Sequence, residues 1–243
     1  MAPPLSVAIV VPVFDDDEAL RRLLARVAEM IASDVGLTCI VVDGAASEST
    51  CTMCERAGVH YVASAPGRGG QLNAGAAAST AEVLWFVHAD AAIDVGHVRA
   101  LRRAVAEGAE GGCFRFRFAD AGGWTPRLIE AGVRLRVALG GIAYGDQGLF
   151  ATRAAFGSVG GFDDVPLFEE VPFVRALRRR GGFAALAVPL AVDARRWRRD
   201  GWWRRTLTNR WLALARLCGV APARLASGYH DRIAEPKERT RDD

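Results

Sequence analysis

The stretch VLWFVHAD, from Val83 to Asp90, decides the fold that this sequence predicts. Five apolar residues in a row are typical of a strand buried on both faces of a sheet. The run ends in a His-Ala-Asp step, where a parallel sheet presents the carboxyl ends of its strands and where open α/β sheets bind ligands. A carboxylate at that edge can hold a divalent cation, and the cation can hold a phosphate. Taken alone, Asp90 could equally be a solvated or helix-capping residue.

Similar apolar runs recur through the first hundred residues, and helical patterns separate them. Strands are predicted at residues 7–13, 38–42, 59–63 and 83–87. Helices are predicted at 20–31, 48–57, 71–79 and around 98–105, with a glycine-rich loop at 66–70. The second half is less regular, with a half-exposed strand at 113–118 and helices at 126–139, 170–180 and about 203–218. The alternation predicts an α/β fold in a single domain, with a mostly parallel central sheet flanked by helices.

The bulk composition fits a globular protein. The chain has 243 residues, of which 51% are hydrophobic, and its 31 basic residues nearly balance its 28 acidic residues. No stretch approaches the roughly 20 apolar residues that a membrane span needs, and we find no signal peptide. The odd number of cysteines argues against a disulfide framework. We therefore expect a cytoplasmic protein, and association with the inner face of a membrane is kept open.

Polar side chains follow successive apolar runs in the first half. Asp15–Asp17 follow the first strand, Asp43 follows the second, Arg68 lies in the glycine-rich loop, and His88 and Asp90 follow the fourth strand. Each has an ordinary interpretation as a turn or capping residue. Because the carboxyl ends of parallel strands meet at one edge of the sheet, their coincidence predicts a ligand site there.

With these residues in place, the chain resembles the inverting family-two glycosyltransferases of the GT-A fold over roughly residues 5 to 230. In the first half, VVPVFDD at 10–16 is similar to the family's PVYNE, VVDGAASEST at 41–50 to VVDDGSTDGT, and GRGGQLNAG at 67–75 to its Gly-Arg/Lys…Asn-x-Gly segment. HAD at 88–90 occupies the Asp-x-Asp position. GGFD at 160–163 precedes Glu169 and Glu170, which sit at the family's Glu-Asp site.

A narrower resemblance is to a bacterial subgroup of small soluble members whose acceptors are mostly unassigned. It rests on GRGGQLNAG, HAD, YGDQGLF and ARRWRRDG taken together. The family resemblance implies a GT-A domain over 5–230, with a nucleotide-binding half at about 5–110 and an acceptor half at about 111–230. Residues 231–243 form a charged tail that we expect to be disordered.

The resemblance implies a site for a nucleotide-diphosphate sugar, and we expect a UDP-sugar. Asp43 would accept a hydrogen bond from the base, and Arg68 would recognise a carbonyl or a phosphate. Asp90 would hold Mg²⁺ or Mn²⁺ on the diphosphate, with His88 either as a second ligand or bonded to the ribose. The residues expected around the donor are Pro12, Phe14, Asp15, Asp16, Asp43, Arg68, Gln71, Asn73, His88, Ala89 and Asp90.

The resemblance also implies catalytic and acceptor residues. Glu170 would be the general base that takes the proton of the acceptor hydroxyl, and Glu169 would hold the acceptor or orient Glu170. A late histidine closes over the metal in some GT-A enzymes, and His230 either does so here or is a surface residue. Contacts with the acceptor or the diphosphate are expected from Asp146, Gln147, Arg195, Arg196 and Trp197.

Two departures from the family pattern keep other functions open. His88 replaces the first Asp of Asp-x-Asp, and Glu170 replaces the usual Asp, so that the base reaches one methylene further. An inactive protein that binds a nucleotide-sugar is one alternative. A nucleotidyltransferase is another, although such enzymes usually carry a Gly-rich basic loop where this chain has its first aspartates. Nucleic-acid binding through the arginines is not expected, because no recognised motif accompanies them.

Arginines and tryptophans cluster late in the chain. The last predicted helix puts Trp203, Leu207, Trp211 and Leu214 on one face. Trp202, Trp203 and Trp211 among the arginines belong either to a helix packed on the sheet with its arginines outside, which we expect, or to a surface that docks on a membrane interface. The expected partners are a nucleotide-sugar donor and an acceptor that is a small molecule or lipid-linked.

Overall fold

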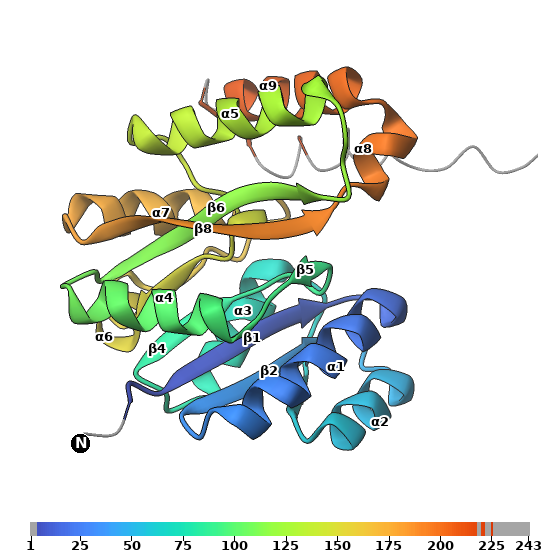
Figure 1. The fold of residues 1–243 in the computed structure, drawn as a ribbon, viewed down its shortest axis with the longest axis vertical. Helices are drawn as coiled ribbons and strands as arrows, with labels where there is room; N and C mark the ends of the chain where they lie inside the picture. The colour runs from blue at the N-terminus through green and yellow to red at the C-terminus, as the bar shows by residue number, and fades with distance from the viewer. Residues whose placement is uncertain (1–3, 218–219, 222–224, 226–243) are drawn as a thin grey trace, which may run out of the picture.

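The computed structural model describes residues 4–217, 220–221 and 225. Within them an eight-stranded sheet runs through the molecule, and helices cover both of its faces (Figure 1). The strands are β1 (Val7–Val13), β2 (Leu37–Asp43), β3 (His60–Ala63), β4 (Val83–Phe86), β5 (Ala91–Ala92), β6 (Gly111–Ala119), β7 (Phe150–Thr152) and β8 (Phe183–Asp193). The helices are α1 (Asp17–Ser33), α2 (Glu48–Ala57), α3 (Arg68–Ala77), α4 (Val95–Ala106), α5 (Trp124–Ala138), α6 (Arg153–Val159), α7 (Glu170–Arg179), α8 (Arg195–Asp200) and α9 (Trp202–Leu217), with a 3-10 turn η1 (Gly145–Gln147). The predicted α/β class is confirmed.

The first half of the sheet is parallel, in the order β3-β2-β1-β4. β1 lies at its centre and pairs with β2 on one side and β4 on the other. Alternate side chains of β1 enter two cores: Ile9 packs with residues of α1 and α4, and Val10 with residues of α3, α6 and α7. Burial on both faces explains why these strands appear in the sequence as continuous apolar runs.

The second half makes the sheet mixed. β7 runs antiparallel to β4 and β6, β8 runs parallel to β6, and β5 runs antiparallel to β8. β6 alternates as predicted, with Arg115 and Arg117 exposed and Phe114 buried. β8 is not apparent in the sequence because FAALAVPLAVD is rich in alanine and contains Pro189. The pairing of β6 with β8 shifts register just before this proline, where a strand tolerates its missing N–H.

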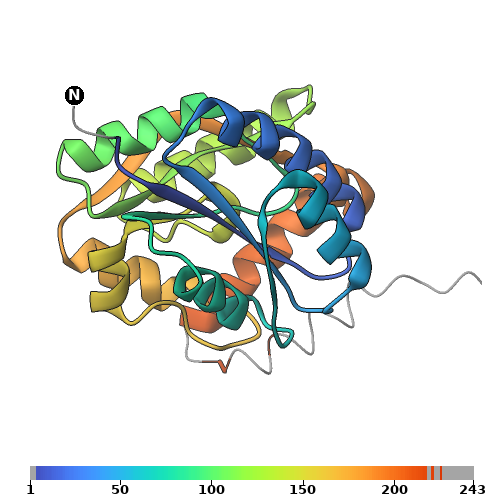
Figure 2. The ribbon, with the colours of Figure 1, turned by 90° about the horizontal axis from the view of Figure 1, so that it is seen from below.

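The helices form layers on either side of the strands. Figure 2 shows blue α1 and green α4 on one side of the sheet and teal α3 and gold α6 on the other. α5 and α9 lie side by side at the far end of the molecule from α2 (Figure 1). They pack around a third cluster that contains Phe116, Phe118 and Val192. No helix of the described part is long and apolar enough to cross a bilayer.

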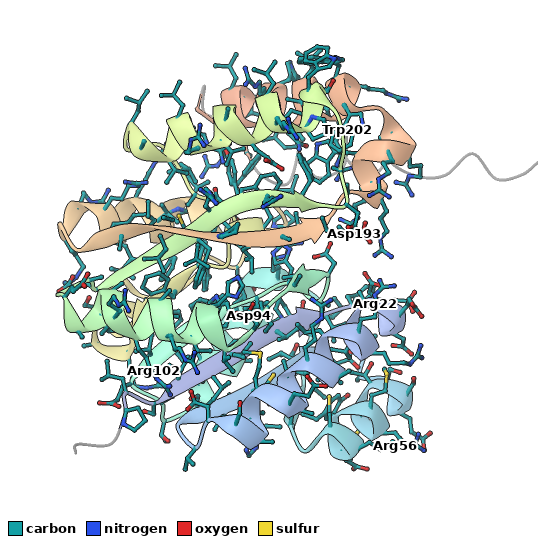
Figure 3. All side chains as sticks on the ribbon, in the orientation of Figure 1. Arg22, Arg56, Asp94, Arg102, Asp193 and Trp202 are labelled. Atoms are coloured by element: carbon teal, nitrogen blue, oxygen red, sulfur yellow. The ribbon has the colours of Figure 1, made fainter. Side chains whose placement is uncertain are left out.

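The expected orientation of α9 is wrong. The predicted inner face is exposed, at Trp203, Leu207, Trp211 and Leu214. Trp202 turns inward instead, and its ring centroid lies 4.9 Å from that of Phe118 (Figure 3). Arg205 is buried, stacks 4.9 Å over the ring of Trp197 and pairs with Asp200. Arg205 and Trp202 therefore anchor α9 to the rest of the fold, and the apolar stripe does not take part in this packing.

α3 begins earlier than predicted. Residues 68–70, expected in a loop, form its first turn. A side chain at Gly69 would meet the carbonyl oxygen of Asp163 at 2.0 Å, and one at Gly75 would meet Cγ1 of Val10 at 2.4 Å. These two glycines therefore let α3 lie close to β1 on one side and close to the loop before α7 on the other.

We expect Gly75→Ala to lower the free energy of unfolding by roughly 1–3 kcal/mol, because the added methyl group overpacks the contact with β1. Gly70→Ala is the matched control on the same helix, since its added methyl meets nothing closer than 3.8 Å. There the higher helix propensity of alanine favours the folded state. Urea denaturation of both variants measures the difference, and equal stabilities would contradict the close approach of α3 to the sheet.

Candidate active site

The carboxyl end of β4 meets η1, the start of α7 and the start of α8 at one end of the sheet. β1 and β8 also end on this side of the molecule, where Asp193 is labelled (Figure 3). A cavity of about 220 Å³ opens there. Its lining includes Arg68, His88, Asp90, Asp146, Glu169, Glu170, Arg196 and Trp197. These residues come from distant segments of the chain, and all of them are among the predicted site residues.

Glu170 is the first residue of α7 and is 7% exposed. Its Oε2 is buried and has no hydrogen-bond partner among the described residues. Burial, followed by the charge of Glu169, raises the pKa of Glu170 to about 8. A helix N-terminus favours the ionised form of a carboxyl group, so the position of Glu170 in the first turn does not explain its raised pKa. A buried carboxyl with a raised pKa in a cavity is a candidate general base.

Glu169 ties the start of α7 to α3. It is 3% exposed, and Nη1 of Arg68 lies 3.4 Å from its Oε1. The preceding residue, Phe168, has a φ of 66°, a left-handed conformation that is rare for a bulky side chain. Its ring lies 6.1 Å from that of Tyr144. Strained residues of this kind cluster at functional sites. Here the left-handed conformation lies directly before the two glutamates.

Burial in the cavity favours the neutral forms of His88, Asp90 and Asp146. Burial, aided by the charges of Arg68 and Arg196, lowers the pKa of His88 to about 3. The imidazole is therefore neutral and offers a lone pair. Burial also raises the pKa of Asp90, and it raises that of Asp146 to about 6. A bound cation would reverse the shifts of the two carboxyl groups, because it favours their ionised forms.

Asp90 and His88 could supply two ligands to a divalent cation whose remaining ligands come from the substrate. They lie in one turn with half-buried Ala89 between them, and carboxylate oxygens suit Mg²⁺ and Mn²⁺. Within residues 4–217 and the few described beyond them, no three His, Cys, Asp or Glu side chains gather into a metal site. One or two protein ligands completed by substrate phosphates is the usual arrangement for Mg²⁺. His230 lies outside the described residues.

Asp43 is buried and already engaged with its own loop. Its Oδ1 accepts a hydrogen bond from the N–H of Ala45 at 2.8 Å, and its Oδ2 accepts one from the N–H of Ser47 at 2.7 Å. The hydroxyl of Tyr61 donates to Oδ2 at 3.4 Å, and Ala46 has a φ of 51°. Asp43 does not line the cavity, and its carboxylate shapes the loop that follows β2.

The side chains of Gln71 and Asn73 also form hydrogen bonds with backbone groups. Nε2 of Gln71 donates to the carbonyl oxygens of Val13 and Val42, each at 2.8 Å. Nδ2 of Asn73 donates to the carbonyl oxygen of Phe162 at 2.8 Å, and its Oδ1 accepts the N–H of the same residue at 2.9 Å. The two side chains join α3 to the ends of β1 and β2 and to the loop before α7, outside the cavity.

Gln147 does not line the cavity, unlike its neighbour Asp146. It is buried, and its Nε2 donates to the carbonyl oxygen of Phe114 at 3.3 Å. Its Oε1 accepts from Nη2 of Arg136 and from the N–H of Tyr144, both at 3.3 Å. The glutamine amide thereby holds η1 in the orientation that places Asp146 in the cavity wall.

The predicted residues after β1 lie at the same edge but outside the cavity. Pro12 is half-buried, whereas Phe14 is 59% exposed and Asp15 is exposed with a φ of 52°. Asp16 pairs with Arg195, whose Nη2 lies 2.8 Å from Oδ2 of the aspartate. This ion pair connects the loop after β1 to the start of α8, on the two sides of the edge.

Some cavity residues are absent from the sequence prediction: Tyr144, Phe168, Arg205, Asn209 and Leu212. Phe168 directly precedes Glu169, and Tyr144 is the first residue of the YGDQGLF motif, so both positions carried a signal that could have identified them. The three residues of α9 carry no such signal, because only tertiary packing brings that helix to the cavity.

Comparison with known families matches residues 8–156, more than half of the chain, to the model of Glycosyl transferase family 2. The chain belongs to this family. Similar curated proteins include uncharacterized glycosyltransferases of Mycobacterium tuberculosis (strain H37Rv) and Mycobacterium bovis, each 28% identical over 106 residues. The matched segment covers 43% of this chain and 46% of each relative. The chain thus spans about half the length of these curated relatives.

Solved structures show the same fold. Glucosyl-3-phosphoglycerate synthase from Mycobacterium tuberculosis, in complex with Mn²⁺, UDP and phosphoglyceric acid, aligns with a TM-score of 0.62 at 18% identity. The alignment covers 89% of this chain and 79% of that one. TarS of S. aureus aligns with a TM-score of 0.60 at 14% identity, over 78% of this chain and 37% of that one. The predicted GT-A fold and the family resemblance are confirmed.

The raised pKa of Glu170 makes the stability of the chain depend on pH. The folded chain keeps this proton up to about pH 8, whereas the unfolded chain loses it near the ordinary pKa of 4.5. Folding takes up a proton between these values, so stability falls as the pH rises. Because Glu170→Gln cannot ionise, we expect it to raise the Tm relative to the unchanged chain by roughly 3 °C or more at pH 8.5, and by much less at pH 5.

Thermal unfolding at the two pH values measures this difference. Glu107→Gln is the control, because this glutamate is exposed at the end of α4. A Tm difference for Glu170→Gln that is the same at both pH values would contradict a buried, protonated carboxyl.

Proposed function

We propose that the chain transfers a sugar, with inversion, from a UDP-sugar to an acceptor hydroxyl in a reaction that depends on a divalent metal. One observation carries the proposal: the unpaired, buried carboxyl oxygen of Glu170 shares a cavity with the carboxyl group of Asp90. Membership of family 2 supports glycosyl transfer. The choice of UDP and Mn²⁺ is supported by the fold neighbour from Mycobacterium tuberculosis, which was crystallised with Mn²⁺ and UDP-glucose.

The nucleotide binds in the half formed by residues of about 5–110, and the acceptor in the half of about 111–230. The ring of Phe14 is exposed and lies against Gly44, where an added Cβ would meet it at 3.2 Å. This ring offers an aromatic face for the base at the ends of β1 and β2. Asp43 supports the nucleotide base indirectly, because its carboxylate accepts hydrogen bonds from N–H groups of the loop after β2 and so fixes that loop.

Positive charge for the diphosphate comes from two arginines that line the cavity, Arg68 on α3 and Arg196 on α8. A divalent cation held by Asp90, with His88 as a second ligand, would neutralise the charge that develops on the leaving nucleoside diphosphate. The neutral imidazole of His88 suits this role, because a protonated ring has no lone pair to offer.

Glu170 takes the proton of the acceptor hydroxyl while the hydroxyl oxygen attacks the anomeric carbon from the face opposite the diphosphate. In-line attack from that face inverts the configuration. The group must be ionised to act, so its raised pKa makes it a strong base that works best at alkaline pH. Arg68 assists by favouring the ionised form, and Glu169 is a positioning residue held by the same guanidinium. On the acceptor side, Asp146 binds hydroxyl groups and Trp197 offers an apolar face.

Calorimetric titration of UDP tests the donor site. We expect Mn²⁺ to strengthen UDP binding at least roughly tenfold, which is about 1.4 kcal/mol. Asp90→Asn should abolish this gain, because the amide removes the charge that the cation requires. Asp120→Asn is the matched control, since it is an exposed aspartate outside the cavity, with a φ of 50° that asparagine tolerates. A gain from Mn²⁺ that survives in Asp90→Asn would refute the metal assignment.

Glu170→Gln tests the catalytic base. We expect this variant to bind UDP like the unchanged chain and to transfer sugar roughly 10²–10⁴ times more slowly, because proton transfer in the transition state is lost. UDP release from UDP-sugars in the presence of hydroxyl acceptors measures the rate, with Glu169→Gln as the neighbouring comparison. Undiminished transfer in Glu170→Gln would exclude it as the base. Tight UDP-sugar binding without turnover in the unchanged chain would favour a binding protein, and release of pyrophosphate would favour nucleotidyl transfer.

A further inference from the structure

One end of the molecule exposes large apolar side chains that the cavity does not use. They lie on the outer sides of α5 and α9, which we call the α5–α9 face: Trp124, Leu128, Leu135, Trp203, Leu207 and Leu214. Each is at least 48% exposed. A cluster of this kind on the surface of a soluble domain usually marks an interaction site.

The two helices form a groove. The groove has a volume of about 400 Å³, and Leu128, Leu135, Trp203 and Leu207 line it. The rings of Trp124 and Trp203 lie 5.9 Å apart at one end, so the two helices present a joint surface. Buried residues on the inner sides, such as Val137 and Leu212, hold the helices to the rest of the fold.

Positive charge surrounds the α5–α9 face. The two helices carry seven arginines and one acidic residue, Glu130. Glu130 accepts a hydrogen bond from the backbone N–H of Phe118, so it is turned toward the sheet. Of the arginines, Arg127 and Arg134 on α5 and Arg204 and Arg210 on α9 are exposed.

A second, strongly basic hollow borders the same helix. It has a volume of about 840 Å³ and lies along β6 and α5, and five arginines in its lining outnumber the acidic Asp120 and Glu130: Arg26, Arg115, Arg117, Arg127 and Arg134. α5 therefore separates the two surfaces: its Leu128 and Leu135 line the apolar groove, and its Arg127 and Arg134 line the basic hollow. Apolar and aromatic residues beside a concentration of arginines match the layers of a bilayer surface, in which acyl chains lie beneath anionic headgroups.

We propose that the α5–α9 face docks on the surface of a bilayer that contains anionic lipids. The leucines enter the acyl boundary, the tryptophans lie at headgroup level, and the arginines of α5 and the basic hollow meet the headgroup phosphates. The charge favours this occupant over a second copy of the chain, because two such faces brought together would oppose arginine to arginine.

The docking face and the candidate cavity share one helix. Arg205, Asn209 and Leu212 line the cavity from the inner side of α9, while Trp203 and Leu207 lie on its outer side. Docking would therefore hold the cavity about one helix diameter from the lipid surface, on the order of 10 Å. The proposal stands apart from the proposed transfer reaction, since it does not require any sugar to be moved.

Vesicle flotation of the full chain tests the proposal. We expect the chain to float with vesicles of equal parts phosphatidylglycerol and phosphatidylcholine, to stay in solution with phosphatidylcholine alone, and to be released as salt rises. Leu135→Glu with Leu207→Glu should lower the bound fraction at least roughly tenfold, since charges cannot enter the acyl boundary. The matched control is Val35→Glu, because Val35 is fully exposed and isolated at the turn before β2.

A second pair of variants keeps the test independent of the apolar groove. Arg127→Glu with Arg134→Glu should also abolish flotation, whereas Arg56→Glu with Arg103→Glu, exposed on α2 and α4, should not. If the leucine pair unfolds the chain, as judged by circular dichroism, the arginine pair decides the result. Absence of flotation, or flotation that neither pair weakens, would overturn the proposal. So would a dimer in sedimentation velocity that Leu207→Glu dissociates, because it would assign the face to a second copy.

Discussion

The close packing of α3 between the sheet and the loop before α7 is the constraint on which the site depends. Gly75 lets the helix approach β1, and Gly69 lets it approach the backbone of the 160s loop. Gln71 then bridges the carbonyl oxygens at the ends of β1 and β2, and Asn73 clamps Phe162 through two hydrogen bonds. Through this one helix, the carboxyl ends of β1 and β2 are connected to the pair Glu169–Glu170, which lies about a hundred residues from α3 in sequence.

The cavity beside α3 buries ionisable groups, which is electrostatically unfavourable for the folded chain. Burial displaces the pKa values of Asp90, Asp146, Glu170 and His88 toward their neutral forms, and the charges of Arg68 and Arg196 oppose the shifts of these carboxyl groups. Burying ionisable groups without full compensation is unfavourable unless a ligand completes the arrangement. A metal ion would favour the ionised carboxyl groups, and a diphosphate would accept hydrogen bonds from the arginines, so this arrangement fits the proposed donor.

α9 gives the fold a second functional surface. Its inner side contributes to the cavity wall, and its outer side combines with α5 into an apolar and basic face. The helix can expose leucine and tryptophan because its anchoring comes from elsewhere, through Trp202 against Phe118 and through Arg205 stacked on Trp197 and paired with Asp200. The two sides of one amphipathic helix thereby connect the proposed chemistry to the proposed lipid surface.

The parallel half of the fold is readable in the sequence, because β1, β2 and β4 are buried on both faces over most of their length and such strands appear as nearly continuous apolar runs. The polar residues at their ends, and the order of the family motifs, predicted the acidic and basic core of the cavity lining in the same way, from Arg68, His88 and Asp90 to Glu170 and Arg196. Tertiary structure decided the rest. β8 forms although its alanines and Pro189 argue against a strand, because β6 supplies an unpaired edge along its length. The side chains of Gln71, Asn73 and Gln147 bond to backbone groups of distant segments, and the stripe on α9 faces outward. These outcomes depend on which backbone groups and rings from distant parts of the chain lie next to each side chain. A periodic pattern in the sequence shows which residues are buried, but it does not show which residues they pack against.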